Sequence, residues 1–239
     1  MPSFIHYIPI LTTLLTIPFT VVLYRHWRRK PEALYLAWWT LGVAMYGIGT
    51  LTESLTTLLG WQEGVFRAWY ISGALLGGAP LAQGTVYLLF SRKTAHYLSA
   101  VLIAAICTAA VCVLLSPIDL TFVEPHRLSG RVLEWQWVRA FSPFINLYAF
   151  VFLAGGAAWS AWKYRRAEQN LRQRMWGNVF IAVGALLPGI GGSATRFGHV
   201  EVLYVTELLG LLLIWRGYHM MTVTPGHSVH ANQQAAATA

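Results

Sequence analysis

Seven long apolar runs, separated by short polar connections, constrain this chain more than any other feature of its sequence. A helix needs about 20 mostly apolar residues to cross the hydrocarbon core of a bilayer, which is about 30 Å thick. The runs cover residues 4–24, 33–59, 65–90, 97–116, 138–162, 175–195 and 202–221. The sequence therefore predicts an all-α fold, a bundle of seven transmembrane helices within residues 1–221, followed by a disordered tail over residues 222–239.

The composition fits this architecture and argues against a soluble domain. The 239 residues are 56% hydrophobic and 11% charged, whereas soluble domains average about 25% charged residues. In a soluble protein, the net charge of +8 would suggest a nucleic-acid partner. Here the positive charge is concentrated in short connections between spans, so we expect contact with the lipid bilayer and none with nucleic acid.

The distribution of basic residues predicts the orientation of the bundle. The connections 25–30, 91–93 and 163–174 follow the first, third and fifth spans and hold eleven of the 17 Lys and Arg residues. The connections on the opposite side hold three Arg residues and no Lys. Because loops rich in Lys and Arg remain in the cytoplasm, we expect the N-terminus outside, a cytoplasmic tail, and multi-pass insertion into the plasma (inner) membrane.

Two acidic residues lie inside the predicted spans. Glu53 is about six residues from the outer end of the second span, and Glu207 is about five residues from the outer end of the seventh. An ionised residue at mid-membrane costs roughly 2.5–3.5 kcal/mol, so such residues are usually paired and often functional. We expect both carboxylates to face the bundle interior and to share Arg67, which begins the third span at a similar depth. The predicted ligand-binding residues are Glu53, Arg67, Tyr70, Arg196, Tyr204 and Glu207.

The same pattern has a purely structural interpretation, in which the polar residues form a buried clamp that fixes helix packing. Several neighbouring residues are also assigned to packing or to the membrane interface. Gly73 and Gly77 form a GxxxG face within the bundle. Gln83 and Asn146 are each expected to make one interhelical hydrogen bond, and Trp69 is assigned to the outer aromatic belt.

Two stretches predict interruptions of helices. Pro80 lies in the middle of the third span and should kink it. The sequence "LLPGIGG" near the end of the sixth span predicts a broken or unwound backbone whose amides, beside Arg196, would cradle an anion. A helix end entering a tight turn is the alternative. The predicted helix-breaking residues are Pro80, Pro188, Gly189, Gly191 and Gly192.

The sequence argues against the common membrane cofactors. Covalently bound retinal needs a lysine inside the last helix, but Lys30, Lys93 and Lys163 all lie in loops. Haem in the membrane needs paired histidines, and the eight His residues lie at span boundaries, in loops or in the tail. We therefore expect no cofactor and no metal site.

Two stretches carry a resemblance to a known group of proteins. They are "FRAWYISGALLGGAPLAQGTVYLLFSRKTAH" (66–96) and "NVFIAVGALLPGIGGSATRFG" (178–198). With them, the second to seventh spans resemble an uncharacterised family of bacterial seven-transmembrane-helix proteins to which no activity is assigned. The resemblance implies a single domain with the topology given above. It also implies that Glu53, Arg67 and residues 188–198 matter to that family.

The function favoured by these features is binding of a small molecule or lipid in an outward-facing polar pocket, as in a sensor or receptor acting through another membrane protein. A small secondary transporter with a 3+1+3 helix plan is one alternative, and it would need a water path past Pro80 and Gln83. A structural subunit of a larger membrane complex is another, with a dry interior and a paired Glu53–Arg67. An enzyme is less favoured, because two carboxylates are present without a nucleophile or metal set.

Overall fold

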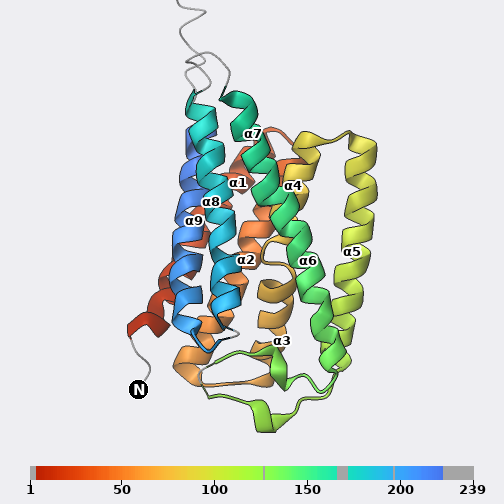
Figure 1. The fold of residues 1–239 in the computed structure, drawn as a ribbon, viewed down its shortest axis with the longest axis vertical. Coiled ribbons are helices and arrows are strands. Elements are labelled where there is room, and N and C mark those ends of the chain that lie inside the picture. The colour runs from red at the N-terminus through yellow and green to blue at the C-terminus, as the bar shows by residue number, and fades with distance from the viewer. Residues whose placement is uncertain (1–3, 126, 166–171, 196, 223–239) are drawn as a thin grey trace, which may run out of the picture.

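The computed structural model describes residues 4–125, 127–165, 172–195 and 197–222, and within these residues the chain is helical without β-strands. The described helices form seven columns that stand side by side (Figure 1). In chain order they are η1 (Phe4–Tyr7) with α1 (Ile8–Arg29); α2 (Leu34–Leu59); α3 (Glu63–Trp69), η2 (Tyr70–Leu75) and α4 (Ala79–Leu89); α5 (Arg92–Leu115); α6 (Phe141–Ala149), η6 (Phe150–Gly155) and α7 (Gly156–Tyr164); α8 (Arg172–Thr195); and α9 (Val200–Thr222). The predicted disordered tail lies, from residue 223 on, outside the described residues.

Five of the described helical segments are long and apolar enough to cross a membrane, as expected for an integral membrane protein. They are Phe4–Arg29, Leu34–Leu59, Arg92–Leu115, Gln136–Tyr164 and Arg172–Thr195. The other two columns differ in kind, because the third is interrupted and α9 carries Glu201, Glu207 and Arg216. The all-helical fold with several candidate membrane spans is thus confirmed, while insertion of all seven columns and their orientation stay predictions.

The third column is interrupted rather than simply kinked. The π-helical segment η2 ends at Leu75, and α4 begins at Ala79 with Pro80 in its first turn. A proline fits there because the first amides of a helix have no partner within the helix. The side-chain amide of Asn146 donates to the carbonyl oxygen of Ala74 at the interruption (3.5 Å). The fifth column contains a second π-helical segment, η6, so two neighbouring columns depart from regular α-helix.

The sixth column corrects a prediction, because α8 runs without a break from Arg172 to Thr195 with Pro188 inside it. The expected unwinding at Pro188, Gly189, Gly191 and Gly192 is therefore wrong, and so is the anion cradle that depended on freed amides. The physical reason is packing. Gly191 lies against α9, where an added Cβ atom would come within 2.6 Å of the Cα atom of Leu203.

Glycines spaced by seven residues bring α8 and α9 into direct backbone contact along an extensive interface (Figure 1). A Cβ atom added at Gly184 would lie 2.7 Å from the carbonyl oxygen of Gly210, and one added at Gly217 would lie 2.4 Å from that of Gly177. A seven-residue period keeps the same face of each helix toward its partner. Small residues on that face allow a close approach without a hydrophobic driving force, which lipid does not provide.

This contact gives a matched pair of glycine substitutions on one helix. We expect Gly184→Ala to lower the free energy of unfolding by about 1–3 kcal/mol, because the new methyl group overlaps backbone atoms of α9 that cannot move aside. We expect Gly189→Ala to be neutral or to stabilise by up to about 1 kcal/mol, since no atom lies within 4 Å of its added Cβ. Thermal unfolding of the purified protein in detergent measures both effects. Equal shifts would contradict the packing role.

Candidate functional site

A second glycine contact sets the position of the buried acid. The Cβ atom of a side chain at Gly49 in α2 would lie 3.2 Å from the Cα atom of Gly73 in η2, so the two backbones touch. Glu53 lies one turn beyond Gly49, and Trp69 lies one turn before Gly73. The two helices run in opposite directions, which places Glu53 opposite Trp69. The indole Nε1 of Trp69 donates a hydrogen bond to Glu53 Oε1 at 3.0 Å.

Glu53 and Glu207 come together inside the bundle, as the sequence predicted. Glu53 is 5% exposed, and its carboxyl group lies within hydrogen-bonding reach of the carboxyl group of Glu207. The Oε2 atom of each residue is buried and receives no hydrogen bond from another described donor. At about 1.5 Å per residue, Glu53 lies roughly 9 Å from the end of α2 at Leu59. A pair of carboxyl groups from α2 and α9 is thus buried in one half of the bundle.

Aromatic and hydroxyl side chains surround this pair. The hydroxyl group of Tyr46 donates to the main-chain carbonyl of Glu207 (3.0 Å). Tyr204 is buried and lies within electrostatic range of both carboxyl groups. Thr50, one turn before Glu53, is hydrogen-bonded to Thr13 of α1 (2.9 Å). We call the following residues the acid-pair cluster: Tyr46, Thr50, Glu53, Trp69, Tyr204 and Glu207.

Positive charge is scarce around the acid-pair cluster. Among the described residues, the ion pairs of Lys and Arg side chains join Arg67 to Glu63 and Arg127 to Glu124, and neither involves Glu53 or Glu207. Arg127 acts electrostatically on Tyr204, but its guanidinium group binds Glu124 and donates to the carbonyl of Thr195 (2.7 Å). The two buried carboxyl groups are therefore not neutralised by a described Lys or Arg side chain.

Arg67 lies elsewhere, which corrects the prediction that it bridges the two carboxylates. Its guanidinium group pairs with Glu63 one turn earlier (2.8 Å). It also donates to the carbonyls of Leu114 and Ser116 (3.0 Å each) and of Val113. The last carbonyls of a helix lack partners within the helix, and this end of the helix dipole attracts a cation. Arg67 therefore closes the end of α5, where it stabilises helix packing.

Tyr70 also lies outside the acid-pair cluster. Its hydroxyl oxygen accepts a hydrogen bond from Ser142 of α6 (3.3 Å), and its ring lies beneath Gly130 of the connection between α5 and α6. Consecutive residues of an α-helix point about 100° apart, so when Trp69 faces α2 its neighbour Tyr70 faces α6. Trp69 is thus the residue that the sequence analysis missed. Arg196 lies outside the described residues, and its expected place at the site stays a prediction.

The end of the bundle nearest the acid-pair cluster is covered by the connection between α5 and α6 (Figure 1). Ile118 and Leu133 pair across this segment, and its residues Val132 and Leu133 are buried. Arg127 ties the segment to the end of α8 through Thr195. The carboxyl groups are therefore enclosed in the described structure, and a ligand would reach them through movement of this cover or of the neighbouring helix ends.

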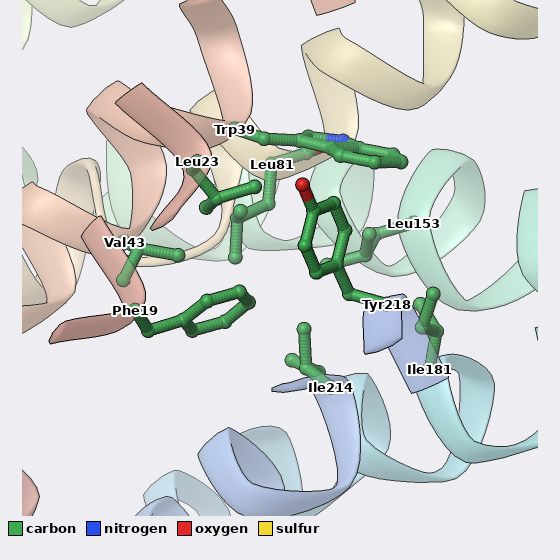
Figure 2. Close-up of a pocket in the computed structure, with 9 residues that line it drawn as sticks. All are labelled: Phe19, Leu23, Trp39, Val43, Leu81, Leu153, Ile181, Ile214 and Tyr218. Atoms are coloured by element: carbon green, nitrogen blue, oxygen red, sulfur yellow. The ribbon is translucent and has the colours of Figure 1, made fainter. Parts of the chain in front are cut away.

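The opposite half of the bundle has a different character. A cavity of about 20 Å³ lies among Phe19, Leu23, Leu81 and further apolar side chains, with Trp39 and Tyr218 at its edge (Figure 2). The polar atoms there are already bonded, because Trp39 Nε1 donates to the carbonyl of Leu81 (3.1 Å) and the Tyr218 hydroxyl pairs with His26 (2.6 Å). A cavity of this size holds about one water molecule, so it offers no place for a larger ligand.

Gln83 forms a second buried polar group, between α4, α5 and α6. Its side-chain amide donates to the carbonyl of Ala95 (3.0 Å) and to the hydroxyl of Ser99 (2.8 Å), and it accepts a hydrogen bond from Tyr148. Gln83 thus makes three bonds where one was predicted, and both hydrogens of its amide nitrogen are used. This satisfied network contrasts with the acid pair, whose outer oxygens lack donors.

The comparisons with known proteins add no family. No protein-family model matches this chain, and no curated protein matches it at a significant level. The function must therefore be argued from the site itself.

The Trp69–Glu53 hydrogen bond can be tested against a matched indole. We expect Trp69→Phe to lower the free energy of unfolding by about 1–3 kcal/mol, because it leaves the buried Glu53 Oε1 atom without its donor. Trp61→Phe removes a buried Nε1 that has no partner in the described structure, and it should cost less. Both variants are compared by thermal unfolding. If Trp61→Phe costs as much, then ring volume and not the hydrogen bond accounts for the loss.

Proposed function

We propose that this chain is a receptor-like integral membrane protein that binds a small molecule at the acid-pair cluster. The observation that carries the proposal is the buried pair of carboxyl groups, Glu53 and Glu207, whose Oε2 atoms have no described donor. Buried polar groups are nearly always satisfied, so the pair requires a partner that no described side chain supplies. Ionisable groups inside a membrane are also concentrated at ligand and ion sites.

The contrast with the rest of the bundle supports binding over a packing clamp. A clamp would be expected to join opposite charges, and Arg67, the natural partner, is instead engaged by Glu63 and the end of α5. Where packing needs a polar group, as at Gln83, the chain satisfies its side-chain hydrogen bonds internally. The acid pair departs from that pattern, as expected of side chains kept for a partner.

A second candidate function, a small secondary transporter, is favoured by one observation. The third column is interrupted between η2 and α4, and it packs against the π-helical fifth column, where a Cβ atom added at Gly78 would lie 3.0 Å from that of Ala149. Discontinuous helices beside a buried ionisable site are typical of transporters. Such a carrier would use the interrupted third column and the π-helical segment of the fifth column as hinges around the acid pair.

The proposal includes a plasma (inner) membrane location with the N-terminus outside, because the described residues of the basic connections, 25–30, 91–93, 163–165 and 172–174, lie at the end of the bundle opposite the acid pair (Figure 1). We expect alkaline phosphatase, which is active only outside the cytoplasm, to be active when fused after residue 62. We expect a green fluorescent protein fused after residue 93 to fluoresce in the cytoplasm. The reverse pattern would place the acid-pair cluster at the cytoplasmic end and overturn this orientation.

Ligand binding is tested by thermal unfolding of the purified protein with a panel of amines, neutral solutes, organic acids and lipid headgroups. At a concentration 100-fold above its Kd, a ligand stabilises the folded state by about 2.7 kcal/mol, which raises Tm by several degrees. We expect at least one compound to do so for the wild type. Glu53→Gln and Glu207→Gln should each abolish the shift.

Glu63→Gln is the matched control, since Glu63 is exposed and pairs with Arg67 outside the cluster. It should retain the ligand-induced shift. The proposal is wrong if no compound raises the Tm of the wild type and if Glu53→Gln and Glu207→Gln each lower Tm sharply in the absence of any compound. The acid pair would then serve packing alone.

A further inference from the structure

The two carboxyl groups of the acid pair cannot bond to each other as two carboxylates, because an ionised carboxylate only accepts hydrogen bonds. Glu53 and Glu207 nevertheless lie within hydrogen-bonding reach of each other in a buried site. We propose that the described structure is a proton-bound form, in which the pair shares one proton, and that the natural ligand carries an ammonium group that replaces this proton. The inference rests on the proposed function and names the chemical class of its ligand.

The shared proton follows from the atoms that the site leaves unfilled. Glu53 Oε1 accepts from the indole of Trp69, but Oε2 of Glu53 and Oε2 of Glu207 receive no hydrogen bond from another described donor. Two negative charges in contact and out of water repel strongly, whereas one proton placed between them gives each carboxyl group a partner. The geometry therefore requires a positive charge at this point. Among the described residues no Lys or Arg side chain pairs with Glu53 or Glu207, which leaves a proton or a ligand to supply it.

An ammonium group suits the same place. It offers three donors and one positive charge, and it can donate to both unfilled carboxylate oxygens once the two groups separate. A neutral or anionic ligand would leave the two carboxylates without a counter-charge.

A divalent metal ion fits the described residues less well. No group of three or more His, Cys, Asp or Glu side chains is positioned to hold a metal within the part of the chain that the structure describes. Calcium and magnesium ions take six or more oxygen ligands, whereas the acid pair supplies two carboxyl groups. The site is thus matched to a ligand with one positive charge.

Other titratable and charged side chains lie near the acid pair, so a released proton has to be assigned to the pair and not to one of them. Tyr46 and Tyr204 lie within electrostatic range of the carboxyl groups, from α2 and α9. The other groups near Tyr204 are Glu201 of α9, His6 of η1, whose ring packs edge-on against it (5.8 Å), and Arg127 of the covering connection. On α3, Glu63 and Arg67 pair with each other.

The exchange balances in charge and atoms. Two carboxylates that share one proton carry a formal charge of −1. When an ammonium ion binds, the shared proton leaves to water and the ammonium group keeps all its protons. The two carboxylates with the bound ammonium ion again carry a formal charge of −1. Binding therefore releases one proton for each ammonium ion bound and becomes stronger as pH rises. A ligand that binds without displacing the proton shows neither effect.

The experiment uses n-butylammonium as the probe, with n-butanol and sodium ion as comparisons. Infrared difference spectroscopy of the purified wild type at neutral pH follows the carbonyl stretch of a protonated carboxyl group, which shifts in heavy water. A pH-indicator dye in weak buffer measures proton release. The double variant Glu53→Gln/Glu207→Gln assigns the band, and Glu63→Gln is the control. Because the probe is also added to the wild type, the test does not depend on the double variant folding.

We expect the band in the wild type and in Glu63→Gln but not in the double variant. We also expect n-butylammonium to remove it with release of about one proton per site, while n-butanol leaves it unchanged. Absence of the band, its persistence at saturating n-butylammonium, or its removal by sodium alone would overturn the inference. If the band persists while a neutral or anionic compound still gives a Glu53-dependent rise in Tm, the ammonium inference fails and the proposed function stands.

Discussion

Where Gly49 meets Gly73, and where Gly184 meets Gly210, helix backbones lie in direct contact, and the arrangement of the bundle depends on these contacts. In lipid there is no hydrophobic force to bring helices together, so close packing and interhelical polar contacts must do so. The first contact places Trp69 beside Glu53, and the second holds α9, which carries Glu207, against α8. The position of the candidate site therefore follows from two pairs of glycines.

The same constraint explains why the acid pair differs from other polar groups of the bundle. Backbone and side-chain polar groups inside a membrane must be satisfied by the protein itself. Gln83 meets this requirement with three bonds, and Arg67 meets it by pairing with Glu63 and closing the end of α5. For Glu53 and Glu207 no described side chain does this at the Oε2 atoms, which are buried without a described donor. This difference is the basis for proposing that the pair binds a ligand.

The structure also relates the site to possible motion. The interrupted third column continues from Trp69 directly into η2 and, past the break, into α4. The covering connection between α5 and α6 is tied to α8 by the hydrogen bond between Arg127 and Thr195, and it closes the end of the bundle nearest the pair. A ligand that separates the two carboxyl groups would move α2 relative to α9. That displacement would reach the interruption through the contact between Gly49 and Gly73.

The sequence by itself determined the helical class, the positions of the apolar columns, a departure from regular helix near Pro80, and the presence of Glu53 and Glu207 within the columns. It could do so because hydropathy and proline act locally along the chain. It did not determine which partners these residues meet. Arg67 and Trp69 lie two residues apart on one short helix. Only the rotation of that helix about its own axis decides that Trp69 bonds to Glu53 while Arg67 reaches α5. Likewise, Pro188 and its neighbouring glycines, taken by themselves, indicate a break in the helix, but packing of Gly191 on α9 keeps α8 helical. Such outcomes depend on contacts between residues far apart in the chain, which only the tertiary structure decides.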